Sequence, residues 1–158
     1  MSMKPTALAS ASDRTLVSYR IEPEHNLRIE EYQGVIRLSD IRALAEAVSA
    51  DSRWTPEFDT LIDFSRATLE LSSNDVLRLA LMLRQERYRS QGWMAFAVGD
   101  ATSYCLVRML GYWSRMTERS RIFRERSEAE HWLVDRAGYR PSKGEAVLVI
   151  GHALPGAM

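Results

Sequence analysis

The segment from Phe58 to Leu83 constrains the fold more than any other part of this 158-residue chain. It reads FDTLIDFSRATLELSSNDVLRLALML. The apolar run predicts a buried strand over Thr60–Phe64, the polar stretch a loop, and the apolar end a helix that begins at Ser72 or Ser73. In α/β proteins, ligands bind beyond the carboxyl ends of such strands. We therefore expect functional residues from Asp63 onward, where the predicted strand ends.

Strand patterns also precede and follow this segment. Leu16–Ile21 and Leu27–Tyr32 alternate apolar with polar residues around a turn that contains proline and asparagine, which predicts a β-hairpin. The uninterrupted apolar run Trp93–Val98 is typical of a strand that is covered on both faces. A short strand is expected over Ser120–Arg124, so strands recur along most of the chain.

Helices are expected between these strands. Ser39 is expected to cap the first helix, and the second is expected to reach about Tyr88, with an apolar face broad enough for thorough burial. Thr102 or Ser103 is expected to cap the third. Ser127, followed three residues later by a glutamate, has the spacing of a capping box for the last.

The order β-β-α-β-α-β-α-β-α predicts an α/β fold with a mostly parallel mixed sheet and an opening hairpin. We expect a disordered tail over residues 1–14, one domain over 15–135 and a C-terminal extension over 136–158. Residues 146–150 (AVLVI) are β-prone. They either add an edge strand to the sheet or pair with another copy of the chain, which would make a homodimer.

This order resembles the STAS fold of the SpoIIAA-like anti-sigma-factor antagonists, over roughly Leu16 to Leu133. In that family an apolar strand and a polar loop lead to Asp-Ser-Ser-Gly, which opens the second helix. Aligned without gaps, the phosphorylatable serine of the family falls on Ser72. Leu71 and Asn74 stand where the family has an acidic residue and a glycine.

The resemblance implies a non-catalytic, regulatory protein-interaction module of bacterial type, without the standard phosphoswitch motif. The alternative lies on the Sec14-like side of the same superfamily, which implies a carrier of a lipid or another small apolar molecule. The first function requires a protein partner and an exposed docking face. The second requires an apolar pocket, expected between the second and third helices.

Four residues are candidates for binding a partner or accepting a phosphate: Asp63, Ser65, Ser72 and Ser73. Each also has a structural interpretation. One serine is expected to cap the second helix, and Ser72 has capping-box spacing with Asp75. Asp63 is expected to accept N–H bonds from its loop or to pair with Arg66, since buried carboxylates are normally paired.

A second set of candidates lies on the third expected helix: Tyr104, Met109, Tyr112 and Trp113. Aromatic residues and methionine are enriched at interfaces, so this set could form an apolar pocket or a dimer face. Packing in the core is the simpler interpretation of the same residues.

Composition bounds the remaining functions. The 21 basic and 21 acidic residues balance, and the arginines alternate with acids along the chain, so we expect no nucleic-acid partner. Cys105 is the single cysteine, which excludes an intramolecular disulfide and suits a reducing, cytoplasmic location. No long apolar stretch predicts a leader or a membrane span. No metal, cofactor or catalytic motif is present, so we expect no cofactor and no enzyme activity.

Overall fold

One six-stranded mixed sheet organises the computed structural model, which describes residues 14–137 and 146–150. The sheet has the order β5-β4-β3-β2-β1-β6. The expected tail, apart from Arg14, and most of the expected C-terminal extension lie outside the described residues. The strands are β1 Leu16–Glu22, β2 Leu27–Ile36, β3 Asp59–Leu69, β4 Met94–Val98, β5 Ser120–Phe123 and β6 Val147–Ile150.

The strand directions confirm the predicted α/β fold. Strands β2 to β5 are parallel, and β1 forms an antiparallel hairpin with β2. Asn26 closes the hairpin in a left-handed conformation (φ 50°), which asparagine tolerates better than most residues. The β-prone segment near the C-terminus forms β6, which pairs antiparallel with β1 of the same chain. The first of its two expected roles is therefore confirmed.

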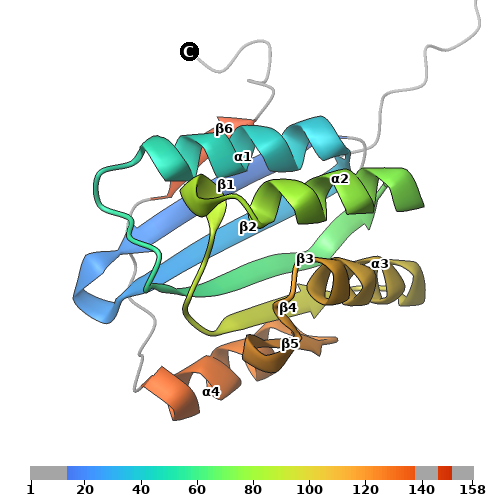
Figure 1. The fold of residues 1–158 in the computed structure, drawn as a ribbon. Helices are drawn as coiled ribbons and strands as arrows, with labels where there is room; N and C mark the ends of the chain where they lie inside the picture. Colours follow the sequence, from blue (N-terminus) through green and yellow to red (C-terminus); the bar gives the residue numbers. More distant parts are fainter. Residues whose placement is uncertain (1–13, 138–145, 151–158) are drawn as a thin grey trace, which may run out of the picture.

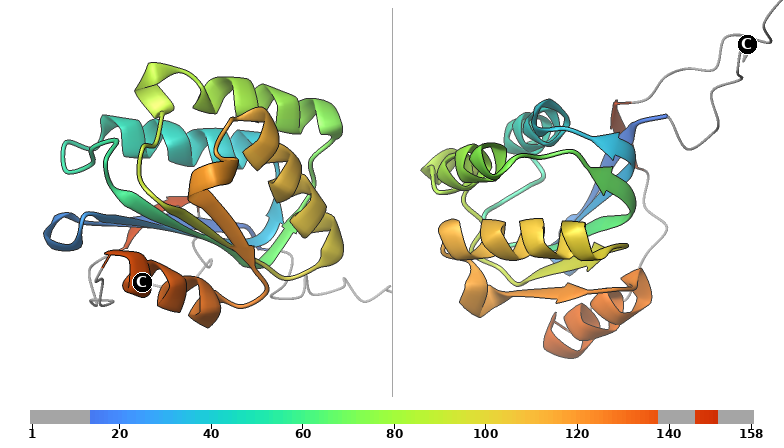
Figure 2. Two further views of the ribbon diagram at one scale, coloured as in Figure 1. Left: turned by 60° about the horizontal axis from the view of Figure 1, so that its bottom comes forward. Right: turned by 90° about the vertical axis from the view of Figure 1, so that its right-hand side faces the viewer.

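Four helices cover the two faces of the sheet unequally (Figure 1). Helices α1, α2 and α3 lie on one face, whereas α4 alone lies on the other, beneath β3, β4 and β5 (Figure 2). We call these the three-helix face and the α4 face. The helices are α1 Leu38–Ala50, α2 Ser73–Leu83, α3 Ala101–Trp113 and α4 Arg126–Ala137.

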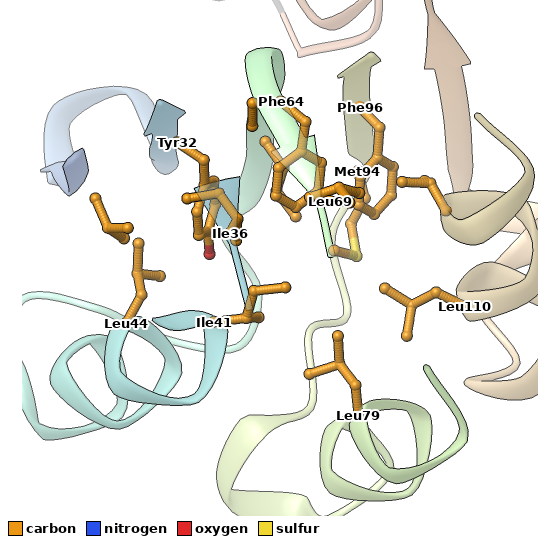
Figure 3. Packing of buried hydrophobic residues seen from close by; sticks show 14 of the residues in the cluster. Tyr32, Ile36, Ile41, Leu44, Phe64, Leu69, Leu79, Met94, Phe96 and Leu110 are labelled. Atoms are coloured by element: carbon orange, nitrogen blue, oxygen red, sulfur yellow. The ribbon is translucent and has the colours of Figure 1, made fainter. Parts of the chain in front are cut away.

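The larger core lies on the three-helix face. Phe64 and Phe96 from the sheet point toward Leu79 of α2 and Leu110 of α3, while Leu44 of α1 packs nearby (Figure 3). A smaller cluster fills the α4 face, where Leu133 and Ala129 cover strand residues that are also fully buried. Because β4 is buried along its whole length, its unbroken apolar sequence is explained by packing on both faces.

Three helix starts differ from the predictions. Helix α1 follows Arg37, whose N–H donates to Asp40 Oδ2 at 2.8 Å, so Ser39 lies inside the helix. Asp100 caps α3 by accepting the Ser103 N–H at 2.7 Å. Helix α4 begins at Arg126, one residue before the predicted cap. In the first two cases a nearby carboxylate, a stronger acceptor than a hydroxyl, determines where the helix begins.

The second expected helix is shorter and less buried than its sequence suggests. Helix α2 ends at Leu83, and a separate 3₁₀ turn spans Glu86–Tyr88. Leu77 is 41% exposed and Leu81 is 51% exposed, whereas Val76, Leu79, Ala80 and Met82 face the core. The expectation of a broadly buried helix is therefore wrong, because only one stripe of α2 faces the sheet.

Candidate functional site

Asp63 lies in the middle of β3 and not at its end, because the strand runs on to Leu69. The expected loop after Phe64 is therefore mostly strand. Glu31 of β2 pairs with Asp63, but Gln33 pairs with Arg66, so β3 carries one extra residue at this point. This β-bulge keeps Ala67 and Leu69 on the buried face that Ile62 and Phe64 occupy.

Asp63 stabilises the bulge directly. Its Oδ1 accepts the backbone N–H of Ser65 at 2.8 Å and the Ser65 hydroxyl at 2.6 Å. Gly99 packs so closely behind the bulge that an added Cβ would lie 2.7 Å from the Ser65 carbonyl oxygen. The loop-holding role expected of Asp63 is confirmed, but its ion-pair partner is Arg126 and not Arg66.

Arg126 joins three carboxylates from three elements. Its Nη1 lies 3.3 Å from Asp63 Oδ2 and 3.2 Å from Glu31 Oε2, and its Nε donates to Glu130 Oε1 at 2.8 Å. Although burial lowers the pKa of Arg126, the Glu130 hydrogen bond and the Glu31 and Asp63 charges raise it above its usual value. We call Arg126, Glu31, Asp63 and Glu130 the Arg126 centre.

A hollow of about 290 Å³ opens beside the Arg126 centre, on the part of the α4 face that α4 does not cover. Its lining is mixed: Ser18, Gln33 and Ser65 contribute polar groups, and Leu16 and Leu148 contribute apolar surface. The polar groups could hold a small hydrophilic ligand, but the carboxylates already bind Arg126. The contacts of the Arg126 centre therefore explain the local structure, and they do not identify a chemical reaction.

Ser72 and Ser73 lie on the other side of the sheet, at the start of α2. The Asp75 N–H donates to Ser72 Oγ at 3.1 Å, and the Ser72 N–H donates to Asp75 Oδ2 at 3.0 Å. The predicted capping box is confirmed, and the hydrogen bonds from Ser72 lower the pKa of the Asp75 carboxyl. Both serines are exposed, and only a short irregular segment separates them from the end of β3.

The four partner-binding candidates do not share one surface. Asp63 faces α4, as its ion pair with Arg126 requires, whereas Ser72 and Ser73 belong to the three-helix face. The sheet separates the two pairs. Asp63 and Ser72 therefore do not belong to one docking face.

The α3 candidates are also divided. Met109 and Trp113 are partly buried and pack against the larger core, whereas Tyr104 is 40% exposed and Tyr112 is 73% exposed. Between the second and third helices, Leu79 and Leu110 pack into the larger core, and the cavity that they border holds only about 50 Å³.

Tyr104 instead lines the strand-end hollow, a space of about 670 Å³ beyond the carboxyl ends of β4 and β5. Asp100, Arg121 and Glu128 contribute charged groups, and Val98 and Phe123 contribute apolar surface. This is the edge of the sheet at which α/β folds bind ligands. Its volume falls within the range of about 300–1,000 Å³ that is usual for small-molecule sites.

A buried charged group within the three-helix face was not predicted. Arg28, Glu30 and Tyr32 point from β2 toward α1 and are buried there. Arg28 Nε lies 3.0 Å from Glu30 Oε1 in an ion pair, and the Tyr32 hydroxyl donates to Glu30 Oε2 at 2.9 Å. We call these three residues the Arg28 centre.

The surroundings of the Arg28 centre are apolar and tightly packed. The Arg28 guanidinium lies 5.3 Å from the ring centroid of Trp54, a cation–π contact. Burial and the neighbouring Glu30 carboxylate raise the pKa of Tyr32 well above its usual value, so the phenol stays protonated. The cavity beside it holds only about 50 Å³, far below the volume of a ligand pocket.

No family model, curated protein or solved structure gave a significant match to this chain. Among residues 14–137 and 146–150, no cluster of histidine, cysteine, aspartate and glutamate has the arrangement of a metal site. Within those same ranges, none of the helices has both the length and the apolar character needed to span a bilayer.

Proposed function

We propose that this chain is a non-catalytic protein-interaction module of the SpoIIAA-like STAS type, and that it docks a regulatory partner protein through the exposed side of α2. The observation that carries the proposal is the pair Leu77 and Leu81. They lie one turn apart, are 41% and 51% exposed, and follow the exposed serines that open the helix. Apolar residues at this spacing present a continuous stripe to a partner.

The interior supports this function over transport of an apolar molecule. The cavity in the three-helix layer, about 50 Å³, leaves no room for a lipid chain. The start of α2 is also the place where the resemblance aligns its phosphorylatable serine. Ser72 already caps the helix there, and a helix N-terminus stabilises added negative charge.

The strand-end hollow favours a second candidate function, the binding of a small molecule. Its volume of about 670 Å³ and its mixed lining of Tyr104, Phe123 and charged groups suit a polar ligand with an aromatic or apolar part. This site borders the start of α3 and the carboxyl ends of β4 and β5, and none of its lining residues belongs to α2.

Native mass spectrometry of the protein isolated from its own host separates the two functions. A protein complex that dissociates on denaturation supports the interaction module. A small non-covalent adduct, lost on denaturation, supports the ligand-binding function and gives the mass of the ligand. The bare chain under all growth conditions would argue against both.

A substitution then tests the docking face. We expect Leu77→Glu combined with Leu81→Glu to abolish the complex without lowering stability, because both side chains already contact water. Tyr112→Glu is the matched control, since Tyr112 is 73% exposed on a different helix. A complex that survives the leucine substitutions, or that is lost equally in the control, would rule out docking through α2.

A further inference from the structure

Four arginines that are scattered along the sequence line one hollow on the surface. Arg84 follows α2, Arg89 precedes β4, and Arg115 and Arg119 lie between α3 and β5. The hollow measures about 560 Å³ and lies at the edge of the sheet opposite to the strand-end hollow. We call it the basic hollow.

No acidic residue in the described part of the chain pairs with the arginines of the basic hollow. None of the four guanidinium groups forms an ion pair within the described part of the chain. No acidic residue is among those that line the hollow. Four like charges around one space repel one another, and an anion bound there relieves that repulsion.

Helix capping explains only part of the arrangement. Arg84 directly follows α2, and Arg115 lies two residues after the end of α3, so both are near a helix C-terminus, where a positive charge interacts favourably with the helix dipole. Arg89 and Arg119 have no such position. Arg119 instead donates to the Ser90 carbonyl oxygen at 3.2 Å, which fixes its guanidinium beside the hollow.

Ser90 lies in the wall of the basic hollow and accepts the hydrogen bond from Arg119 through its carbonyl oxygen. It lines the basic hollow and is only 6% exposed, yet its hydroxyl has no hydrogen-bond partner among the described residues. The hydroxyl oxygen is inaccessible to solvent and lies beneath the surface of the hollow, so a ligand in the hollow meets the guanidinium groups and not this hydroxyl.

We propose that the basic hollow binds a small ligand through a diphosphate group or through two neighbouring phosphates. The planar guanidinium fork pairs with phosphate oxygens through two parallel hydrogen bonds, and several arginines around one space match several phosphate oxygens. The volume admits more than a single phosphate, since it falls within the range of small-molecule sites. This site is separate from the α2 surface, so the two proposals stand independently.

Isothermal titration with inorganic pyrophosphate tests the site on the full chain. We expect saturable binding with one pyrophosphate per chain. Combining Arg84→Gln with Arg89→Gln should weaken it at least about tenfold, because each lost guanidinium removes charge-assisted hydrogen bonds. Both side chains are exposed and form no ion pair or side-chain hydrogen bond within the described structure, so the fold should be kept with at most a small loss of stability at the end of α2. Lysine at both positions should restore binding in part, since it keeps the charge but not the fork.

Matched variants and vesicles complete the test. Arg42→Gln with Arg78→Gln removes the same charge from exposed positions elsewhere and should leave binding within about twofold, because distant exposed charges are screened. Vesicles that contain a bisphosphorylated inositol lipid determine whether the phosphates belong to a headgroup or to a soluble molecule. Absence of pyrophosphate and vesicle binding, or equal weakening in the matched variant, would overturn the proposal.

Discussion

The Arg28 centre and the Arg126 centre use the same chemistry on opposite faces of one sheet. The side chains of Arg28 and Glu30 are 9% and 8% exposed, whereas those of Arg126 and Glu31 are 28% and 41% exposed. The first centre lies on the three-helix face, where α1 covers it, and the start of α4 borders the second. Both centres pair an arginine with glutamate, so the difference in their burial is set by the helices that cover each face. We expect this difference in burial to determine how much each ion pair affects the free energy of unfolding.

The buried centre should give the largest effect when it is broken. Arg28→Met removes the positive charge and leaves the Glu30 carboxylate buried with only the Tyr32 hydroxyl as partner. We expect a loss of about 3–5 kcal/mol in the free energy of unfolding, because the remaining charge keeps its full desolvation cost. Urea unfolding measures this difference.

The double variant sharpens the result. Adding Glu30→Leu to Arg28→Met removes both charges and should recover most of the lost stability, since apolar residues of similar volume replace buried ion pairs without large cost. A single variant within about 1 kcal/mol of the parent would show that the Glu30 carboxylate is hydrated or protonated after substitution.

The Arg126 centre should respond less to the equivalent change. Arg126→Met leaves Glu31 and Glu130 in contact with water, and Asp63 keeps the two hydrogen bonds from Ser65. We expect a loss of roughly 1–2 kcal/mol, also measured by urea unfolding, mostly from the buried Asp63 oxygen that loses its partner. A loss as large as that of Arg28→Met would contradict the contrast between the faces.

The succession of strands and helices along the chain and the two-sided burial of β4 could be predicted from the sequence, because each depends on local periodicity and turn residues. The faces of β2 could not. Leu27 and Ile29 face α4 while Arg28 and Glu30 face α1, so both faces are buried and alternation no longer distinguishes inside from outside. Only the position of α1 over this strand shows which charges are buried.

The bulge in β3 explains why the candidate site was only partly predicted. Its extra residue shifts the alternation between Phe64 and Ala67, so the pattern after Phe64 resembles a loop. Ser72 was predicted correctly as a cap because capping is local. The pairing of Asp63 with Arg126, 63 residues away, leaves no signal in a single sequence, and neither does the gathering of four arginines around the basic hollow.

Asp51 provides the smallest and most specific test, because its carboxylate is stabilised at the margin of the three-helix face. Hydrogen bonds from Arg53, with a further one from the Tyr19 hydroxyl, outweigh the effect of burial and lower the Asp51 pKa from 3.8 to about 2. Between pH 3.8 and about 2, Asp51 is already protonated in the unfolded chain but still ionised in the folded protein. The contribution of Asp51 is therefore fully present above pH 3.8 and is lost as the pH falls toward about 2.

Asp51→Asn isolates this contribution from those of the other carboxylates, which titrate in the same range. We expect the difference in unfolding free energy between the parent and Asp51→Asn to shrink as the pH falls from 3.8 to about 2, and to stay constant above that window. The change should be smaller than that of either arginine centre, because Arg53 is 47% exposed and solvent screens the pair. A difference that is independent of pH would show that the charge of Asp51 does not contribute to stability. Its hydrogen bonds alone would then account for the effect of the substitution.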